Sequence, residues 1–190
     1  MVFVRLAHLM HLGRLVSVFV LAGCNVVGLA RLTVAPTIDT LGHVGADVRV
    51  LFAPAVGAGS ADGWMGISAG IGGSYVGGAG AAHVTLFPEL GIPVEPVLLR
   101  AGLGYSGRFL AADCPSARQG EVAGWQAPLV LFGLDAPLTR TQWTPGYYPP
   151  VVRLGPELTG EYLVSLAPCG SANRGLFSLG LSLSVLFYLR

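Results

Sequence analysis

Lysine is absent from this 190-residue chain, and charged residues of either sign are scarce. Charged residues make up 11% of the chain, against about 25% in an average soluble protein. All the basic residues are arginine and they are spread among the acids, so no basic patch points to nucleic acid, and we expect no such partner. Because 53% of the residues are hydrophobic, we expect part of the apolar surface to face lipid rather than water.

A long hydrophobic run is also missing from the body of the chain. Beyond residue 30, Gly, Pro, Arg, Asp or Glu interrupts every apolar stretch before it reaches the ~18 residues that a membrane-spanning helix requires. If this body crosses a membrane, it must do so with strands. Its length suits a single domain.

The first thirty residues have the features of an export signal. Arg5 and Arg14 precede an apolar stretch at residues 15–24 that ends in small residues. Its last four residues, Leu21-Ala22-Gly23-Cys24, resemble the lipobox of bacterial lipoproteins. That resemblance implies a signal peptide at 1–23, a diacylglyceryl lipid (with palmitate) on Cys24 and a lipidated linker at 24–30; no other cofactor is expected. Cleavage after Ala30 and an uncleaved helix remain open alternatives.

From residue 31 onward, apolar and polar residues alternate, which is typical of strands with two unlike faces. At residues 43–52, for example, Val48 and Val50 alternate with Asp47 and Arg49. Eight segments are predicted as strands: residues 31–39, 43–52, 64–75, 81–89, 97–106, 121–134, 151–166 and 177–189. An even number of strands suits a closed antiparallel barrel without an unpaired edge, so we predict an all-β, up-and-down barrel at 31–190.

Alternation alone does not determine which face is inside, and a lipocalin-like barrel with an apolar interior would alternate equally well. At residues 66–74 of segment 64–75 and residues 178–184 of segment 177–189, however, the face opposite the apolar one carries only Gly and Ser, which suits a crowded lumen wall. The charges on the corresponding faces have both signs and can neutralise one another. We therefore predict an apolar exterior and a lumen charge network of Asp47, Arg49, Arg100, Arg153, Glu157 and Glu161.

At this point the pattern of residues 31–190 resembles the small outer-membrane barrels of Gram-negative bacteria, the OmpA-transmembrane, OmpX and OmpW-like group. Residues 181–188 resemble the terminal strand that barrel-assembly machinery recognises in that group, although this chain ends on Leu189-Arg190 and not on an aromatic residue. The resemblance implies an outer-membrane location, with membrane lipid and the assembly machinery as partners. It favours a structural or interaction role with a plugged polar lumen. A narrow pore, a soluble periplasmic lipoprotein and a lipid-modifying barrel enzyme are the alternatives.

The remaining candidate residues are cysteines, histidines and aromatics. Cys114 and Cys169 fall in the loops after the fifth and seventh strands, which emerge on the same side, so we predict a disulfide in the oxidising export compartment. His43 and His83 are expected in the lumen, and no catalytic constellation or metal site is predicted. Aromatic residues near strand ends are expected to form interfacial girdles: Trp64, Tyr75, Tyr105, Trp125, Trp143, Tyr147, Tyr148 and Tyr188.

Two features depart from the barrel pattern. The stretch at residues 53–63 is too long for the short turn expected there, and residues 136–150 form a second long connection. Prolines, which cannot donate to a strand ladder, lie in or beside several predicted strands: Pro36, Pro54, Pro88, Pro96, Pro128 and Pro156.

Overall fold

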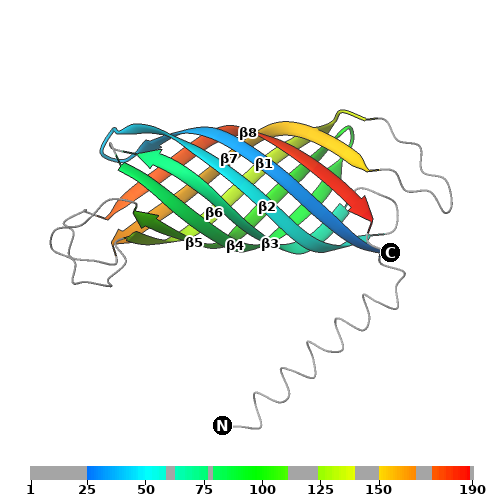
Figure 1. Ribbon diagram of the computed structural model, residues 1–190. Coiled ribbons are helices and arrows are strands. Elements are labelled where there is room, and N and C mark those ends of the chain that lie inside the picture. Colours follow the sequence, from blue (N-terminus) through cyan, green and yellow to red (C-terminus); the bar gives the residue numbers. More distant parts are fainter. Residues whose placement is uncertain are drawn as a thin grey trace, which may run out of the picture.

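A computed structural model describes residues 25–58, 63–76, 79–110, 124–139, 150–165 and 173–188. Within these ranges the chain forms eight antiparallel strands in sequence order, and β8 pairs with β1 to close the barrel (Figure 1). The strands are β1 (Asn25–Asp39), β2 (Val44–Ala58), β3 (Gly63–Val76), β4 (Ala79–Val94), β5 (Val97–Leu110), β6 (Gly124–Pro137), β7 (Val151–Ser165) and β8 (Arg174–Tyr188). The predicted fold class and strand number are confirmed.

Six of the eight strands are longer than predicted, and β6 and β7 are the exceptions. Residues 25–30, which we expected to be a linker, are the first six residues of β1, where Val27 pairs with Ala55 of β2 and Tyr188 of β8. Residues 53–58, which we expected to be a loop, continue β2 as far as Ala58. Both predictions were wrong because these stretches are apolar on both faces, so alternation no longer marks them as strands.

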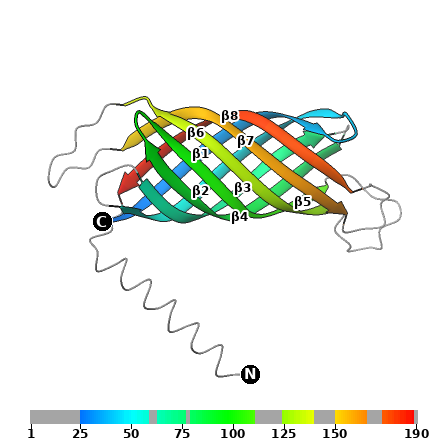
Figure 2. The same cartoon turned by 180° about the vertical axis from the view of Figure 1, so that it is seen from behind.

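The two ends of the barrel are distinguished by the strand ends that lie there (Figures 1 and 2). We call the end where β1 begins and β8 finishes the terminal mouth, and the opposite end the distal mouth. Connections at the distal mouth join β1 to β2, β3 to β4, β5 to β6 and β7 to β8. Cys114 and Cys169 belong to the last two of these connections but lie outside the described residues, so their disulfide remains a prediction.

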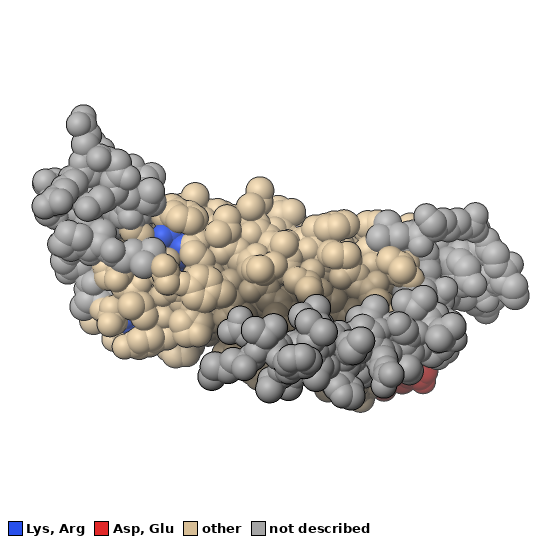
Figure 3. Space-filling model, turned by 90° about the horizontal axis from the view of Figure 1, so that it is seen from below, with Lys and Arg blue, Asp and Glu red and all other residues tan. Residues whose placement is uncertain are grey.

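The outer wall is apolar. Large hydrophobic side chains such as Ile71, Leu103 and Leu181 point outward, with 68%, 64% and 54% of their surface exposed. In the described part of the chain, Glu95, in the β4–β5 turn, is the only Asp, Glu or Arg that is exposed. In the space-filling view, coloured charged atoms accordingly appear only toward the ends of a tan wall (Figure 3). Such an inverted surface needs an apolar solvent, because soluble proteins rarely expose apolar patches of more than a few hundred Å².

The prolines are accommodated on the outward face. Pro36, Pro54, Pro88, Pro128 and Pro156 are all exposed residues within strands. One ladder skips each of these prolines: the β4–β5 register, for example, passes from Leu86 to Glu89, and the β6–β7 register passes from Gln126 to Leu129. The missing donors therefore interrupt the ladder locally without ending the strands.

Small residues make the lumen wall thin where large side chains cross it. A Cβ at Gly133 would lie 2.5 Å from Nη2 of Arg100, and a Cβ at Gly72 would lie 2.3 Å from Nε2 of His83. A Cβ at Gly104 would lie 2.2 Å from the Cβ of Phe87. Glycine at these positions leaves the space that the side chains of neighbouring strands occupy.

Candidate functional site

The lumen nearer the terminal mouth is crossed by an ion-pair network that we call the terminal cluster: Arg31, Glu89, Arg100, Asp135 and Glu157. Arg100 is its centre. Its Nη1 lies 2.8 Å from Glu157 Oε2 and 3.2 Å from Glu89 Oε1, and its Nε lies 2.8 Å from Asp135 Oδ2. Arg31 pairs with the same two glutamates from β1, at 3.0 Å to Glu157 and in a short contact with Glu89.

Hydroxyl groups complete the terminal cluster. Ser68 donates to Glu89 at 2.5 Å, Thr33 donates to Glu157 at 3.1 Å, and Ser184 donates to Asp135 at 3.2 Å. These contacts run between strands that are not neighbours in the barrel, such as β1 with β4 and β7. The network therefore bridges the bore and does not merely line it.

A second network, the distal cluster, lies nearer the other mouth: Asp47, Arg49, His83, Arg108 and Glu161. Arg108 Nη2 lies 2.7 Å from Glu161 Oε1 and 3.2 Å from Asp47 Oδ2. Arg49 is held more loosely, at 3.4 Å from Asp47 and 3.7 Å from Glu161. Opposite charges are matched in number within this cluster, which reduces the cost of burying them.

Apolar layers separate and cover the two clusters. Along the inward face of β4, Phe87 stands between His83 of the distal cluster and Glu89 of the terminal cluster. Phe87 packs in a buried group with three leucines of β2 and β6: Leu51, Leu129 and Leu131. A group around Trp64 and Leu98 fills the terminal mouth, and a group around Trp125 and Leu176 fills the distal mouth.

Trp64 and Trp125 were expected on the lipid-facing girdles, and that prediction was wrong. Their exposed fractions are 3% and 5%, and both point into the bore as plugs. Tyr75 and Tyr105 do face outward, with exposed fractions of 57% and 46%. The other predicted girdle residues lie outside the described side chains.

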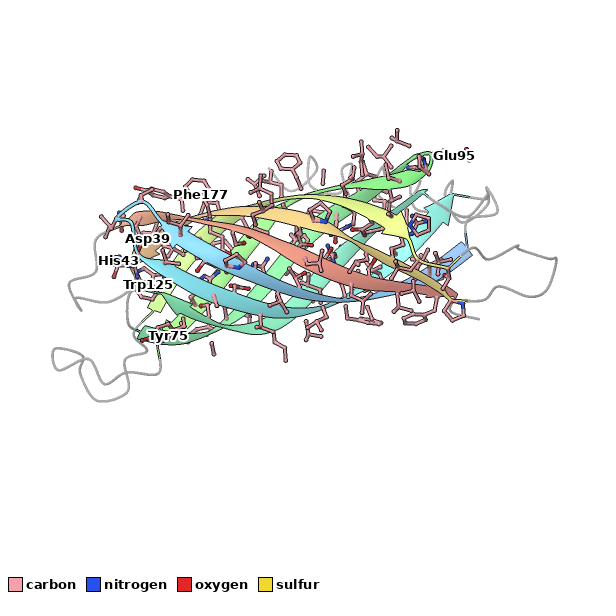
Figure 4. All side chains as sticks on the ribbon, turned by 90° about the horizontal axis from the view of Figure 1, so that it is seen from above. Asp39, His43, Tyr75, Glu95, Trp125 and Phe177 are labelled. Carbon is pink, nitrogen blue, oxygen red and sulfur yellow. The ribbon has the colours of Figure 1, made fainter. Side chains whose placement is uncertain are left out.

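The distal mouth is tied together by a small polar cluster (Figure 4). Asp39, at the end of β1, accepts hydrogen bonds from the backbone N–H groups of Leu41 and His43, both at 2.9 Å. Its other oxygen lies 2.9 Å from both His43 Nδ1 and Arg174 Nη1. The Arg174 guanidinium in turn lies 4.9 Å from the ring centroid of Trp125. His43, which we expected in the lumen, therefore lies in the β1–β2 turn with its side chain 48% exposed.

All six residues of the predicted lumen network are buried in the bore. Arg49, Asp47 and Glu161 meet in the distal cluster, and Arg100 and Glu157 meet in the terminal cluster. Arg153 is buried in the lumen wall, opposite Ser184 in the β7–β8 register. Four further charged members were missed: Arg31, Glu89, Arg108 and Asp135.

Nothing in the described residues resembles a metal centre, because no group of three or more His, Cys, Asp or Glu is placed to hold an ion. Among the same residues there is no helix with the length and hydropathy needed to cross a membrane. Cys24 lies outside the described residues and immediately precedes β1 in the sequence.

No protein-family model matches the chain, and no curated protein matches it either. Solved structures do match. Neisserial surface protein A (NspA) aligns with a TM-score of 0.51 and 14% sequence identity, over 86% of this chain and 97% of that one. The outer membrane enzyme PagL aligns with a TM-score of 0.48 and 13% identity, over 81% of this chain and 97% of that one. The alignment with NspA and the closed barrel of eight strands show that the chain has the fold of the small outer-membrane barrels, as the sequence resemblance predicted.

Proposed function

We propose that this chain is an outer-membrane β-barrel whose bore is closed by its own side chains, and that its role is structural or interactive. The observation that carries the proposal is the filled lumen. Arg31 and Arg100 bridge carboxylates across the bore, and Phe87 and its leucine neighbours form an apolar layer between the two clusters. A solute would have to break buried ion pairs and pass three apolar layers.

The membrane placement is supported by the wall itself. A barrel in water would have to expose its lipid-like exterior and bury nearly every charge that its described part contains. In a bilayer the same arrangement is favourable. The closed barrel pairs the backbone N–H and C=O groups of every strand internally, and its apolar face contacts the acyl chains. A soluble lipocalin-like barrel would have the opposite distribution.

A narrow pore is the second candidate, favoured by the Gly and Ser positions that face the lumen in β3 and β8. Side chains of other strands occupy the space at those positions: a Cβ at Gly70 would lie 2.3 Å from Cδ2 of Leu51 on the neighbouring strand β2, and Ser182 accepts a hydrogen bond at 2.8 Å from Arg100, which reaches it across the bore from β5.

Conductance distinguishes the two candidates. We expect the purified barrel to give no stable single-channel steps in planar lipid bilayers, because its lumen is bridged and layered. The same preparation should show a gel band that shifts on heating, which establishes that folded barrel was present. Reproducible steps from heat-modifiable protein would contradict the closed bore and favour the pore.

The proposal includes a lipid on Cys24. Cleavage before Cys24 leaves β1 complete, whereas cleavage after Ala30 would remove its first six residues, including the plug residues Val27 and Leu29. The lipid would then sit at the terminal mouth, next to the start of β1.

The variant Cys24→Ser tests this part separately. We expect it to lose incorporated radiolabelled palmitate while still requiring detergent for extraction, because the barrel wall alone partitions into the membrane. Cys114→Ser is the matched control and should keep the label. Label retained in Cys24→Ser would contradict the lipidation, and a variant that dissolves without detergent would contradict the membrane barrel.

A further inference from the structure

A hollow of ≈ 460 Å³ opens on the outside of the barrel, across β2 to β5. Its outward lining side chains are apolar: Val48, Val50, Ile71, Ala82, Val84 and Phe109. Gly73 lies in the middle, where a Cβ would meet no atom within 4 Å. The missing side chain at this position creates the depression, and Gly72 and His83, whose positions face the lumen, complete the lining from below.

The hollow lies toward the distal mouth. Gly73 is three residues from the distal end of β3, and Tyr75, the next outward residue on that strand, stands above it with 57% of its surface exposed. Figure 4 places Tyr75 at the same end as Asp39 and His43, and opposite Glu95. Tyrosines at such positions mark the boundary between headgroups and acyl chains. At Gly80, which pairs with Tyr75, an added Cβ would also meet no atom within 4 Å, so the open space beside the hollow continues onto β4.

We propose that this hollow holds one acyl chain of a bilayer lipid from the leaflet at the distal mouth. The inference rests on the membrane placement proposed above. An apolar space of this size does not retain water, which needs polar partners, so in a bilayer the surrounding chains must fill it. A flexible chain below Tyr75 can follow the depression between Ile71 and Phe109 and lie against all of its apolar lining.

The shape of the wall argues against a second copy of the chain as the occupant. Two barrels are convex and would touch along a narrow strip, whereas a stable protein interface buries about 800 Å² per partner. The outward lining also carries no charged side chain that could orient a protein partner. An acyl chain requires neither a flat surface nor a charge.

Filling the hollow tests the proposal. Gly73→Phe adds a Cβ that meets no atom within 4 Å, and its ring can extend outward over the hollow, so the barrel should still fold. Gly160→Phe is the matched control, because Gly160 faces outward on β7, four strands away, and a Cβ there makes only ordinary contact with Phe177 at 3.7 Å. All proteins are the full chain refolded into dimyristoylphosphatidylcholine vesicles.

Two measurements report on the bound chain. Native mass spectrometry after transfer to detergent should find one retained phospholipid on the wild type and on Gly160→Phe, and a lipid-bound fraction about tenfold lower on Gly73→Phe. In intact vesicles with spin-labelled phosphatidylcholine, Gly73→Phe should immobilise one lipid fewer per barrel than Gly160→Phe.

Equal lipid retention and equal immobilisation in the two variants would overturn the proposal. If both variants still insert and show the heat-dependent gel shift, only the acyl-chain site fails. If the wild type itself does not insert into the vesicles, the membrane placement fails with it.

Discussion

Replacing Arg100 with methionine is expected to destabilise the folded barrel by about 3–5 kcal/mol, because it removes the central cation of a buried network. The Arg100 guanidinium contacts Glu89, Asp135 and Glu157, and none of these carboxylates reaches solvent. Methionine fills a similar length but leaves three carboxylates to share Arg31 and a few hydroxyls. The measurement is chemical unfolding of the barrel in lipid vesicles, followed by tryptophan fluorescence.

Two further variants define the origin of that loss. Leu103→Met lies on the outward face of the same strand and should change the free energy of unfolding by less than about 0.5 kcal/mol. The double variant Arg100→Met with Glu157→Gln should recover part of the loss, since it removes one uncompensated charge. If Arg100→Met resembled Leu103→Met, the terminal cluster would not stabilise the fold, and the closed bore would lose its main support.

Part of the lumen network could be predicted from the sequence, because in the middle of the strands the charged residues fall on one face of a clearly alternating segment. Asp47 and Arg49 lie on one face of a clearly alternating segment, as do Arg153, Glu157 and Glu161 of another. The four missed residues stand at or beyond predicted strand ends. Arg108 lies two residues past position 106, and Asp135 lies one residue past position 134, although both keep the parity of the inward residues before them.

The plugs were missed for a different reason. Trp64 has the same parity as Gly66 and Ser68, so alternation places it inside, but its position near a strand end suggested a girdle. On β6 the inward residues Ala127 and Leu129 are as apolar as the outward residues Val130 and Phe132, so no contrast between faces was available.

Contacts across the bore could not be predicted from the sequence at all. Arg31 on β1 pairs with Glu157 on β7, although β8 lies between these two strands in the wall, and it also pairs with Glu89 on β4. Whether two such residues lie at the same height along the barrel axis depends on the register stagger summed over all the strand pairs between them. Sequence patterning fixes the face of each residue but not this height.

A single arginine on the outer wall gives the sharpest test of the membrane placement. Leu181 lies in the middle of β8 with 54% of its surface exposed, and we expect Leu181→Arg to cost about 2–4 kcal/mol of unfolding free energy in a bilayer. The cost arises because the guanidinium would enter the hydrocarbon layer without a partner. In a barrel surrounded by water, the same surface substitution would change stability by only about 0.5 kcal/mol.

Depth provides the control for that experiment. Val44, the first residue of β2, is 72% exposed at the distal mouth, where an arginine can reach the headgroups, so Val44→Arg should cost only about 0–1 kcal/mol. The comparison is made by chemical unfolding in one vesicle preparation, so lipid composition and salt are the same for both variants. Equal and small costs at the two positions would mean that the wall does not face hydrocarbon. The apolar exterior would then have to be covered by protein in a water-soluble assembly. A large cost at Leu181 alone would place the middle of β8 within the bilayer, because both positions are exposed and only a solvent that changes with depth would penalise the arginine at one of them.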